Sequence, residues 1–448
     1  MQITTVYQVR RICMRKRFIS AVLAAALCGS LMTAPALAAS DNSSAADKAA
    51  ADAIDAVTGS GEPSLVEKDL YPEDPAGTVS FENLEKRVRE HNANILTLEE
   101  TIATLEAIDY DEMSDELRDG MNAIMDVIWA KDDLPPAFSS AVGLDRVSYD
   151  SLQSSYDSMR KTFDDIKEGA FQQDNADTIR QLRSAQNQVV IGAESLYIAL
   201  VDLEIQEAAL LRQLAAMDRT VQEMELRYKM GQISTLTLQQ VKTGRTQLSS
   251  GISTLQMNMT VLKMQLEQML GVELTGSIKL GPLPQVQAAQ VEQLTPDTDL
   301  IAAKEQSYTI YDAQKTLDDA EEEYEDTADD YDHDEKNYHY LMALHTWNAA
   351  QHTYASNIQG FELSFRSTYL KVTDFLQALS AAEESLALEQ ANYKVAELKY
   401  QQGTISKNAL LDAQDKLTTA EESVQSASID LFTAYHNYLW AVEYGIIN

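Results

Sequence analysis

The sequence predicts an all-α protein built from two long antiparallel helical hairpins. Three observations predict this fold class: a turn motif that occurs twice, apolar residues at a 3.5-residue period on both sides of each turn, and few turn-forming residues. The 448 residues include only 9 Pro and 17 Gly, whereas sandwiches and barrels need a turn about every ten residues. Hydrophobic residues make up 45% of the chain, which is enough to build a core.

The N-terminus has the pattern of a secretory signal peptide. A short basic block precedes an apolar run over residues 18–32, and Ala36-x-Ala38 fits a signal-peptidase site. We therefore interpret residues 1–38 as a cleaved signal peptide and expect an exported protein of the cell envelope, in the outer membrane or at the cell surface. A permanent N-terminal anchor is the alternative.

Removal of this segment changes the composition of the mature chain. Both cysteines, Cys13 and Cys28, lie within it, so we expect neither a disulfide nor a thiolate metal site. The remaining chain has 30 basic and 70 acidic residues, and its net charge moves from −35 to about −40. Such a balance argues against nucleic acid or an anionic membrane surface as partner, because both would repel it.

One turn motif, Tyr-x-x-Gly-x-Ile-Ser, occurs twice at positions 172 residues apart. The glycine supplies a left-handed residue that ends a helix, and the serine is a good N-cap for a returning helix. The motif therefore predicts a helix–turn–helix at both places. Its two copies consist of Tyr228, Gly231, Ile233 and Ser234, and of Tyr400, Gly403, Ile405 and Ser406.

Apolar residues alternate at spacings of four and three along both flanks of each turn. A period of 3.5 residues held this long indicates coiled-coil packing. On the first repeat the pattern predicts helices over residues 181–229 and 234–270. The four stripes run from Leu196 to Tyr228, from Leu238 to Met269, from Val372 to Tyr400 and from Leu410 to Ala441.

A second, weaker apolar seam lies on the other side of the helix before the first turn. Each residue turns ~100° around a helix, which places this seam about 160–200° from the first. Two opposed seams predict neighbours on both sides, as in the wall of a helical barrel; a helix buried in an ordinary bundle is the alternative. The seam consists of Ile198, Val201, Ile205, Ala208 and Ala215.

These patterns predict five segments. The signal peptide, residues 1–38, is followed by a flexible acidic linker over residues 39–78. Helical repeat 1 covers residues 79–274 and helical repeat 2 covers residues 299–448. The inter-repeat linker between them, residues 275–298, is rich in Gly and Pro near its start.

The duplicated turn, the long heptad flanks and the signal peptide resemble the TolC-type outer membrane efflux proteins. Residues 79–95 are similar to that family's opening helix, although Ala93 stands where the family usually has proline. The resemblance covers most of residues 79–274 and 299–448, as TolC-like α-barrel half-repeats. It implies a homotrimeric tube of long helices for efflux or secretion, with no enzymatic activity, no small-molecule cofactor and no nucleic acid.

The resemblance also implies a role for the two turns. In the family they form the tips of the tube, where they meet a periplasmic adaptor protein that works with an inner-membrane pump, and they close the entrance. Carried over, the adaptor-contact residues are Tyr228, Gly231, Ile233, Ser234, Tyr400, Gly403, Ile405 and Ser406.

The sequence departs from the family where membrane strands are expected. Such strands need about ten residues of alternating apolar and polar side chains. Neither residues 110–180 nor residues 318–365 offer an apolar lipid face, so there is no clear transmembrane β-barrel. This departure keeps a second function class open: a cell-surface or wall-associated coiled-coil scaffold without transport activity.

Two clusters of polar residues have some features of metal sites. Asp330, Asp332 and Asp334 have the spacing of a calcium loop, but Glu335 stands where the loop needs glycine. Four histidines, His333, His339, His345 and His352, form no HExxH or close i,i+4 pair. Solvated surface is the favoured interpretation for both clusters. No nucleophile–base motif or phosphate loop is present, so the sequence predicts neither a metal nor a catalytic site.

Overall fold

A computed structural model describes residues 74–75, 77–133 and 149–447. These residues belong to one compact unit, residues 66–448. The predicted signal peptide, residues 1–38, and nearly all of the predicted linker over residues 39–78 lie outside the described residues.

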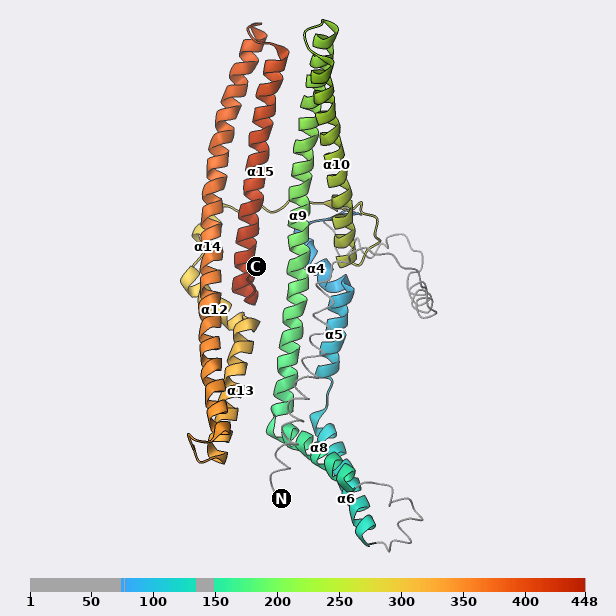
Figure 1. Cartoon of the computed structure of the whole chain (residues 1–448), viewed down its shortest axis with the longest axis vertical. Coiled ribbons are helices and arrows are strands. Elements are labelled where there is room, and N and C mark those ends of the chain that lie inside the picture. The colour runs from blue at the N-terminus through green and yellow to red at the C-terminus, as the bar shows by residue number, and fades with distance from the viewer. Residues whose placement is uncertain (1–73, 76, 134–148, 448) are drawn as a thin grey trace, which may run out of the picture. The chain divides into compact units, whose positions relative to one another are not determined.

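The all-α prediction is confirmed for the described part of the chain, in which the only strands are two of two residues each. Figure 1 shows the arrangement of the helices. None of the described helices is both long and apolar enough to cross a membrane. In chain order the elements are β1 (Thr78–Val79), α4 (Phe81–His91), α5 (Ala93–Glu106), α6 (Tyr110–Asp133), α8 (Tyr149–Glu168), α9 (Ala170–Lys229), α10 (Thr235–Met269), β2 (Lys279–Leu280), α11 (Ala288–Glu292), α12 (Pro296–Gln306), α13 (Tyr308–Asp330), α14 (Tyr338–Gln401) and α15 (Lys407–Tyr444).

Two antiparallel hairpins, α9–α10 and α14–α15, form the main part of the fold. Helices α9 and α14 have 60 and 64 residues, which corresponds to lengths of about 90 and 96 Å. Helix α9 begins at Ala170, earlier than the apolar pattern predicted. Its polar first turns are tied to α13, where Lys315 forms ion pairs with Asp174 and Asp177. Tertiary contacts that the periodicity does not report therefore extend the helix.

The apolar stripes predicted from the sequence lie inside the hairpins, except for the last residues of two of them, Tyr228 and Tyr400, which are exposed at the turns. Ile252, Met259 and Leu266 of α10 are buried at the predicted seven-residue spacing. On the second hairpin, Val372 of α14 and Ala420 of α15 are buried, and further seam residues near them are partly buried. Burial of one stripe on each helix is what coiled-coil packing requires.

The second seam of α9 also has a neighbour, as predicted. Ile198 is buried in a core cluster that includes Ile429, Phe432 and Trp440 of α15. Val201 and Ile205 pack against the same cluster, whereas Ala208 and Ala215 are exposed. Helix α9 thus contacts α10 on one side and α15 on the other.

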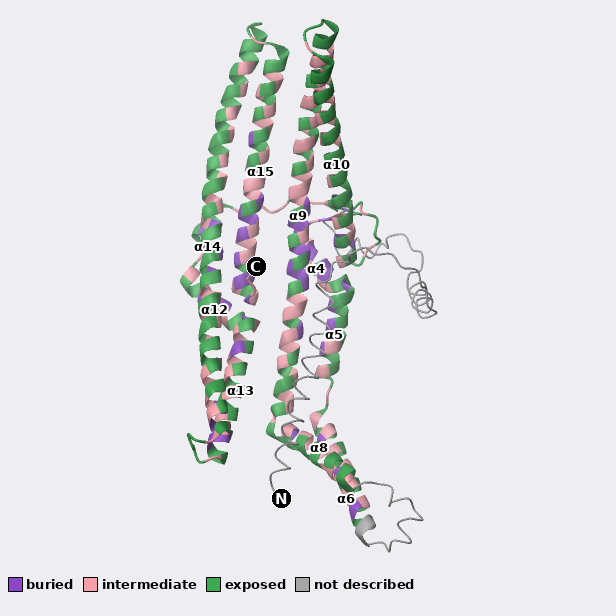
Figure 2. Ribbon diagram, viewed as in Figure 1, coloured by how far each residue is buried: buried purple, intermediate pink, exposed green. Residues whose placement is uncertain are grey.

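Burial is concentrated away from the hairpin turns. Figure 2 shows buried residues gathered around the middle of α9, in the C-terminal half of α15 and near α4. In α9 the last buried residue before the turn is Leu200, and in α14 it is Val372. In α10 and α15 the first buried residues after the turn are Ile252 and Ala420. The turn-proximal halves of the hairpins therefore contain only partly buried seams.

The duplication extends to the helices that open each repeat. Between α4 and α5 the chain bends at Asn92, with φ −72° and ψ 119°. Between α12 and α13 it bends at Ser307, with φ −69° and ψ 116°. Both residues are buried, and both side chains accept backbone N–H groups of the following helix. The two bends thus have the same backbone conformation and the same capping role.

The segment that joins the repeats is fixed to repeat 1. Strands β1 and β2 pair in parallel, with Thr78 opposite Lys279. The Tyr197 hydroxyl donates to the carbonyl oxygens of Gly281 at 2.7 Å and Val79 at 3.1 Å, and burial raises the pKa of this phenol. The joining segment is therefore held against β1 and α9.

Candidate functional site

The candidate site consists of the two hairpin turns, which we name tip 1 (residues 228–234) and tip 2 (residues 400–406). Gly231 and Gly403 have φ of 71° and 70°, so both are left-handed. The N–H of each glycine bonds the carbonyl three residues back, at 2.9 Å in both turns. The next N–H bonds the carbonyl five residues back, also at 2.9 Å. These bonds define a Schellman motif, which satisfies carbonyls at the end of a helix.

The returning helices start with the predicted serine caps. The Ser234 hydroxyl accepts the N–H of Thr237 at 3.1 Å, and that of Ser406 accepts the N–H of Ala409 at 3.2 Å. Ile233 and Ile405 are partly buried under the turns. The structure thus brings the eight predicted site residues into two turns of matching backbone geometry.

The side chains around the tips differ more than the backbones do. Tip 1 is bordered by Leu226, Met230 and Leu236, all of which are exposed. At tip 2, Leu398 is likewise exposed, but Gln402 and Asn408 stand where tip 1 has Met230 and Leu236. Tip 1 therefore presents the more apolar surface.

The tyrosine of each motif lies on the surface and is not a core residue. Tyr228 is 41% exposed and Tyr400 is 39% exposed. Only at tip 1 does the hydroxyl take part in a side-chain hydrogen bond, which it accepts from Thr235 at 3.3 Å. Both tyrosines are accordingly in contact with solvent.

Two arginines join the hairpins below the tips. Arg212 of α9 forms an ion pair with Glu422 of α15 at 2.5 Å and donates to the Asp415 carbonyl oxygen at 3.1 Å. Arg219 forms an ion pair with the Asp415 carboxylate at 2.5 Å. Because these pairs are partly buried, they are less screened than surface pairs. These pairs link α9 to α15, and both tips lie at the same end of the paired hairpins (Figure 1).

A buried polar contact joins the same two helices farther from the tips. The Glu194 carboxylate of α9 lies 2.8 Å from His436 Nε2 and accepts Trp440 Nε1–H at 2.8 Å. Glu194 is only 3% exposed. A buried carboxylate needs such partners. No pattern in the sequence indicates this contact, because the partners lie 242 and 246 residues apart.

The acidic and histidine-rich residues lie around the turn between α13 and α14. Asp330 ends α13, and Asp332 and His333 have positive φ. Aromatic contacts dominate here: Tyr331 stacks on His339 with ring centroids 5.2 Å apart, and Tyr324 stacks on Trp347 at 4.8 Å. Within the described ranges, no group of three or more His, Cys, Asp or Glu is arranged to hold a metal ion.

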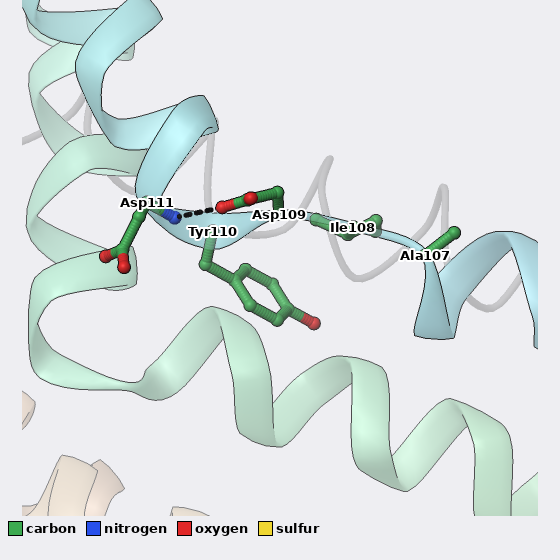
Figure 3. A pocket seen from close by; sticks show the side chains of 5 residues that line it. All are labelled: Ala107, Ile108, Asp109, Tyr110 and Asp111. Carbon is green, nitrogen blue, oxygen red and sulfur yellow. Dashed lines mark hydrogen bonds between the residues drawn. The ribbon is translucent and has the colours of Figure 1, made fainter.

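A surface hollow at residues 107–111, between α5 and α6, has a structural explanation. Figure 3 shows the Asp109 carboxylate accepting the N–H of Asp111, at 3.0 Å. It also accepts the N–H of Glu112 at 3.0 Å. The Tyr110 hydroxyl accepts a hydrogen bond from Asn175 at 3.1 Å. The polar groups of this hollow thus cap and anchor the start of α6.

Comparison with known proteins identifies the fold. No family model matches the sequence, and no curated protein matches it either. The outer-membrane channel OprN is similar in structure, with a TM-score of 0.52 and 14% sequence identity over 82% of this chain and 90% of that one. The Campylobacter jejuni outer membrane channel CmeC gives a TM-score of 0.47 with 13% identity, over 64% of this chain and 68% of that one. The Vibrio cholerae outer membrane protein VceC gives 0.42 with 14% identity, over 61% and 74%.

The chain therefore has the helical-hairpin fold of TolC-like outer-membrane channels. This confirms the resemblance inferred from the duplicated turn at the level of the fold, with OprN as the structure that carries the comparison. At such low identity the comparison defines the architecture, and the roles of individual residues stay predictions.

Proposed function

We propose that this chain is an exported conduit component of a TolC-like efflux or secretion system in the cell envelope, and that it works as a homotrimer. In this proposal tips 1 and 2 dock to a periplasmic-adaptor-like protein, which connects the conduit to an inner-membrane pump. The chain itself performs no catalysis and uses no cofactor.

The observation that carries the proposal is the matched geometry of the two tips. A fold shared with an outer-membrane channel supports a conduit in general. Duplicated turns with the same hydrogen bonds, at one end of the paired hairpins, form a regular surface on which a repeated partner can dock. The exposed Tyr228, Met230 and Leu236 at tip 1 suit a partly apolar protein contact.

A glycine exchange tests the proposal. Valine at both Gly231 and Gly403 would disfavour the left-handed backbone, because β-branched residues rarely adopt it. We expect this double variant to lose copurification with the adaptor and export of the cargo, while the core remains folded. The cellular assays are adaptor copurification and cargo efflux in the native host.

The matched control is Gly244→Ala. Gly244 lies inside α10, and nothing lies within 4 Å of where a Cβ would stand, so export should stay unchanged. If the Gly231→Val/Gly403→Val chain exports like the natural chain, the tip proposal is wrong. If deletion of the whole protein leaves export intact but alters the cell surface, the coiled-coil scaffold replaces the conduit.

A further inference from the structure

The two tips share a backbone geometry but differ in charge. With the 172-residue offset of the turns, residues 221–239 around tip 1 correspond to residues 393–411 around tip 2. The first segment has two acidic and two basic residues and is neutral, whereas the second has three lysines and one glutamate and a net charge of +2. The whole chain has a net charge of −35. Tip 2 therefore lies in a basic segment of a strongly acidic chain.

At tip 1 most of the charged side chains neutralise one another. Arg227 forms an ion pair with Glu223, one helical turn earlier, at 2.5 Å. Glu225 forms an ion pair with Lys242 of α10 at 2.6 Å. Three of the four charged residues in this segment are therefore paired within the chain.

At tip 2 the lysines have no such partners. The counterpart of Arg227 is Lys399, but Val395 stands where tip 1 has the acidic partner one turn earlier. Lys394 and Lys407 stand where tip 1 has uncharged residues. All three lysines are exposed, and none of them forms an ion pair within the part of the chain that the structure describes. Their charges therefore face solvent without compensation from a neighbouring carboxylate.

One of these lysines has a charge that its own helix does not favour. Lys407 is the first residue of α15. The helix dipole stabilises acidic side chains at the start of a helix and disfavours basic ones there. At the corresponding position of α10, Thr235 has no charge. Helix stability therefore does not explain Lys407, which leaves a contact outside the chain as its role.

Exposed apolar side chains lie next to the lysines of tip 2. Leu398 directly precedes Lys399 in α14 and is 58% exposed, and Val395 is 49% exposed. A protein segment that covers this surface must bury apolar groups and present carboxylates, because an ammonium group pairs most strongly with an anionic oxygen.

We propose that tip 2 binds an acidic, partly apolar segment of a partner protein, and that Lys399 and Lys407 pair with carboxylates of that segment. The proposal names the chemistry of the partner and rests on the proposed docking at the tips. The acidic remainder of the chain repels such a segment, but salt screens this repulsion over ~8 Å. Attraction at tip 2 therefore orients the partner toward the turn.

Two synthetic helical peptides test the partner chemistry on the purified full-length chain. Both have leucines on one face, and the other face has glutamates in one peptide and lysines in the second. We expect the glutamate peptide to bind, to bind more weakly as salt increases, and not to be displaced by the lysine peptide. A carbodiimide, which joins amines to adjacent carboxylates, should couple the glutamate peptide to Lys399 and Lys407, as located by mass spectrometry. Absence of binding, or equal coupling at all exposed lysines, would overturn the proposal.

Charge reversal provides the matching variant. Lys399→Glu/Lys407→Glu should weaken binding of the glutamate peptide by about tenfold. The fold should persist, because both side chains are exposed and the dipole favours glutamate at the start of α15; an unchanged helical circular dichroism spectrum checks this. Lys399→Arg/Lys407→Arg keeps the charges and should retain most of the binding, but a guanidinium group is not coupled by carbodiimide. Equal binding by the natural chain and the glutamate variant would contradict the proposal.

The control reverses two exposed lysines far from the tips. Lys161 lies in α8 and Lys336 in the turn before α14, and both are exposed. Lys161→Glu/Lys336→Glu changes the net charge by the same amount as the tip variant, so binding of the glutamate peptide should stay the same. If the control weakens binding as much as the tip variant does, net charge and not tip 2 governs binding, and the proposal is wrong.

The outcomes separate the chemistry of tip 2 from the conduit function. Suppose adaptor copurification is lost with Gly231→Val/Gly403→Val but is unchanged with Lys399→Glu/Lys407→Glu. That result would retain the proposed function and overturn the acidic partner. A chain that binds and couples the glutamate peptide at tip 2, but copurifies with no adaptor and exports nothing, would retain the binding site and contradict the proposed function.

Discussion

Glycines occupy equivalent left-handed positions at both ends of each hairpin, but their surroundings differ. At the tips, Gly231 and Gly403 have φ of 71° and 70°, and nothing lies within 4 Å of where a Cβ would stand. At the bases, Gly271 and Gly445 have φ of 65° and 64°. A Cβ on Gly271 would lie 2.6 Å from the His91 carbonyl oxygen, and one on Gly445 would lie 2.3 Å from the Ser307 nitrogen.

Glycine is needed for different reasons at the two ends of a hairpin. At the tips, only the left-handed backbone angle requires glycine, and the turn is otherwise open to solvent. At the bases, glycine is required both by the backbone angle and by the lack of room for a Cβ, because the hairpin end packs against the bend between the opening helices. The hairpin bases thus pack within each repeat, while the tips have open space around their glycines.

The largest predicted effect contrasts Gly445→Ala with Gly231→Ala. Alanine at Gly445 combines left-handed strain with displacement of the Ser307 backbone, for a predicted loss of about 3–5 kcal/mol in the free energy of unfolding. Alanine at Gly231 adds the left-handed strain alone, for a predicted loss of about 1–2 kcal/mol in the free energy of unfolding. Chemical denaturation followed by circular dichroism measures both. Equal losses would mean that the base contact adds nothing.

The next effect concerns a carboxylate that only the first hairpin base has. Glu267 is 2% exposed and accepts the N–H groups of Gly276 at 2.6 Å, Ser277 at 3.0 Å and Ile278 at 3.1 Å. Glu267→Gln replaces charge-assisted hydrogen bonds and leaves at least one donor poorly paired, so we predict a loss of about 2–4 kcal/mol. The control Glu225→Gln, at an exposed ion pair near tip 1, should change stability much less.

The same carboxylate predicts a pH dependence. Burial raises the pKa of Glu267, but the hydrogen bonds from Gly276, Thr275 and Ile278 outweigh burial and hold it below its usual value. A lowered folded-state pKa means that this stabilisation is complete above the unfolded value of about 4.3 and is lost as the pH falls through the folded value. Unfolding measured between pH 6 and pH 3 should therefore show a smaller decrease for Glu267→Gln than for the natural chain. Identical pH profiles would contradict this assignment.

A smaller effect tests whether backbone strain or the size of the new side chain destabilises substitutions of the tip glycines. Asparagine tolerates the left-handed region better than alanine does. At Gly231 and Gly403 alike, we expect Asn to recover about half of the ~1–2 kcal/mol lost with Ala. Thermal unfolding of the four single variants checks this. If Asn and Ala destabilise equally, a contact other than backbone strain limits these turns.

The smallest effect tests whether the two tips are equivalent. Each serine hydroxyl caps its helix by accepting a backbone N–H, with N to Oγ distances of 3.1 Å at Ser234 and 3.2 Å at Ser406. Ser234→Ala and Ser406→Ala each remove one of these caps. We predict a similar loss of ~1 kcal/mol from each, the usual value for an N-cap. Threonine at either position should restore most of the stability. Losses that differ by more than twofold would show that the tips are not energetically equivalent.

The sequence predicted the hairpin turns well and missed the matching bends of the opening helices. The turns repeat as identical residues, because a left-handed residue and an N-cap each allow few residue types. The bends are made by Asn92 in one repeat and Ser307 in the other, with few shared residues around them. Two different side chains perform the same capping, so sequence identity does not reveal the duplication there. The start of α9 at Ala170 was missed because its first turns contact segments far away in the sequence. Lys315 of α13 pairs with Asp174 and Asp177, and Phe171 packs edge-on against Tyr110 of α6.

Patterns in the sequence are enough to predict the all-α class, the two hairpins, the coiled-coil stripes and the residues of both tips. Those features depend on local backbone preference and on periodicity along one helix, which a sequence records directly. Which apolar positions become buried depends on tertiary contacts, because the neighbours of each position lie far along the chain. Ile198 and Leu370 are similar in type and duplicated in position. Ile198 has α15 beside it, whereas Leu370 is 62% exposed.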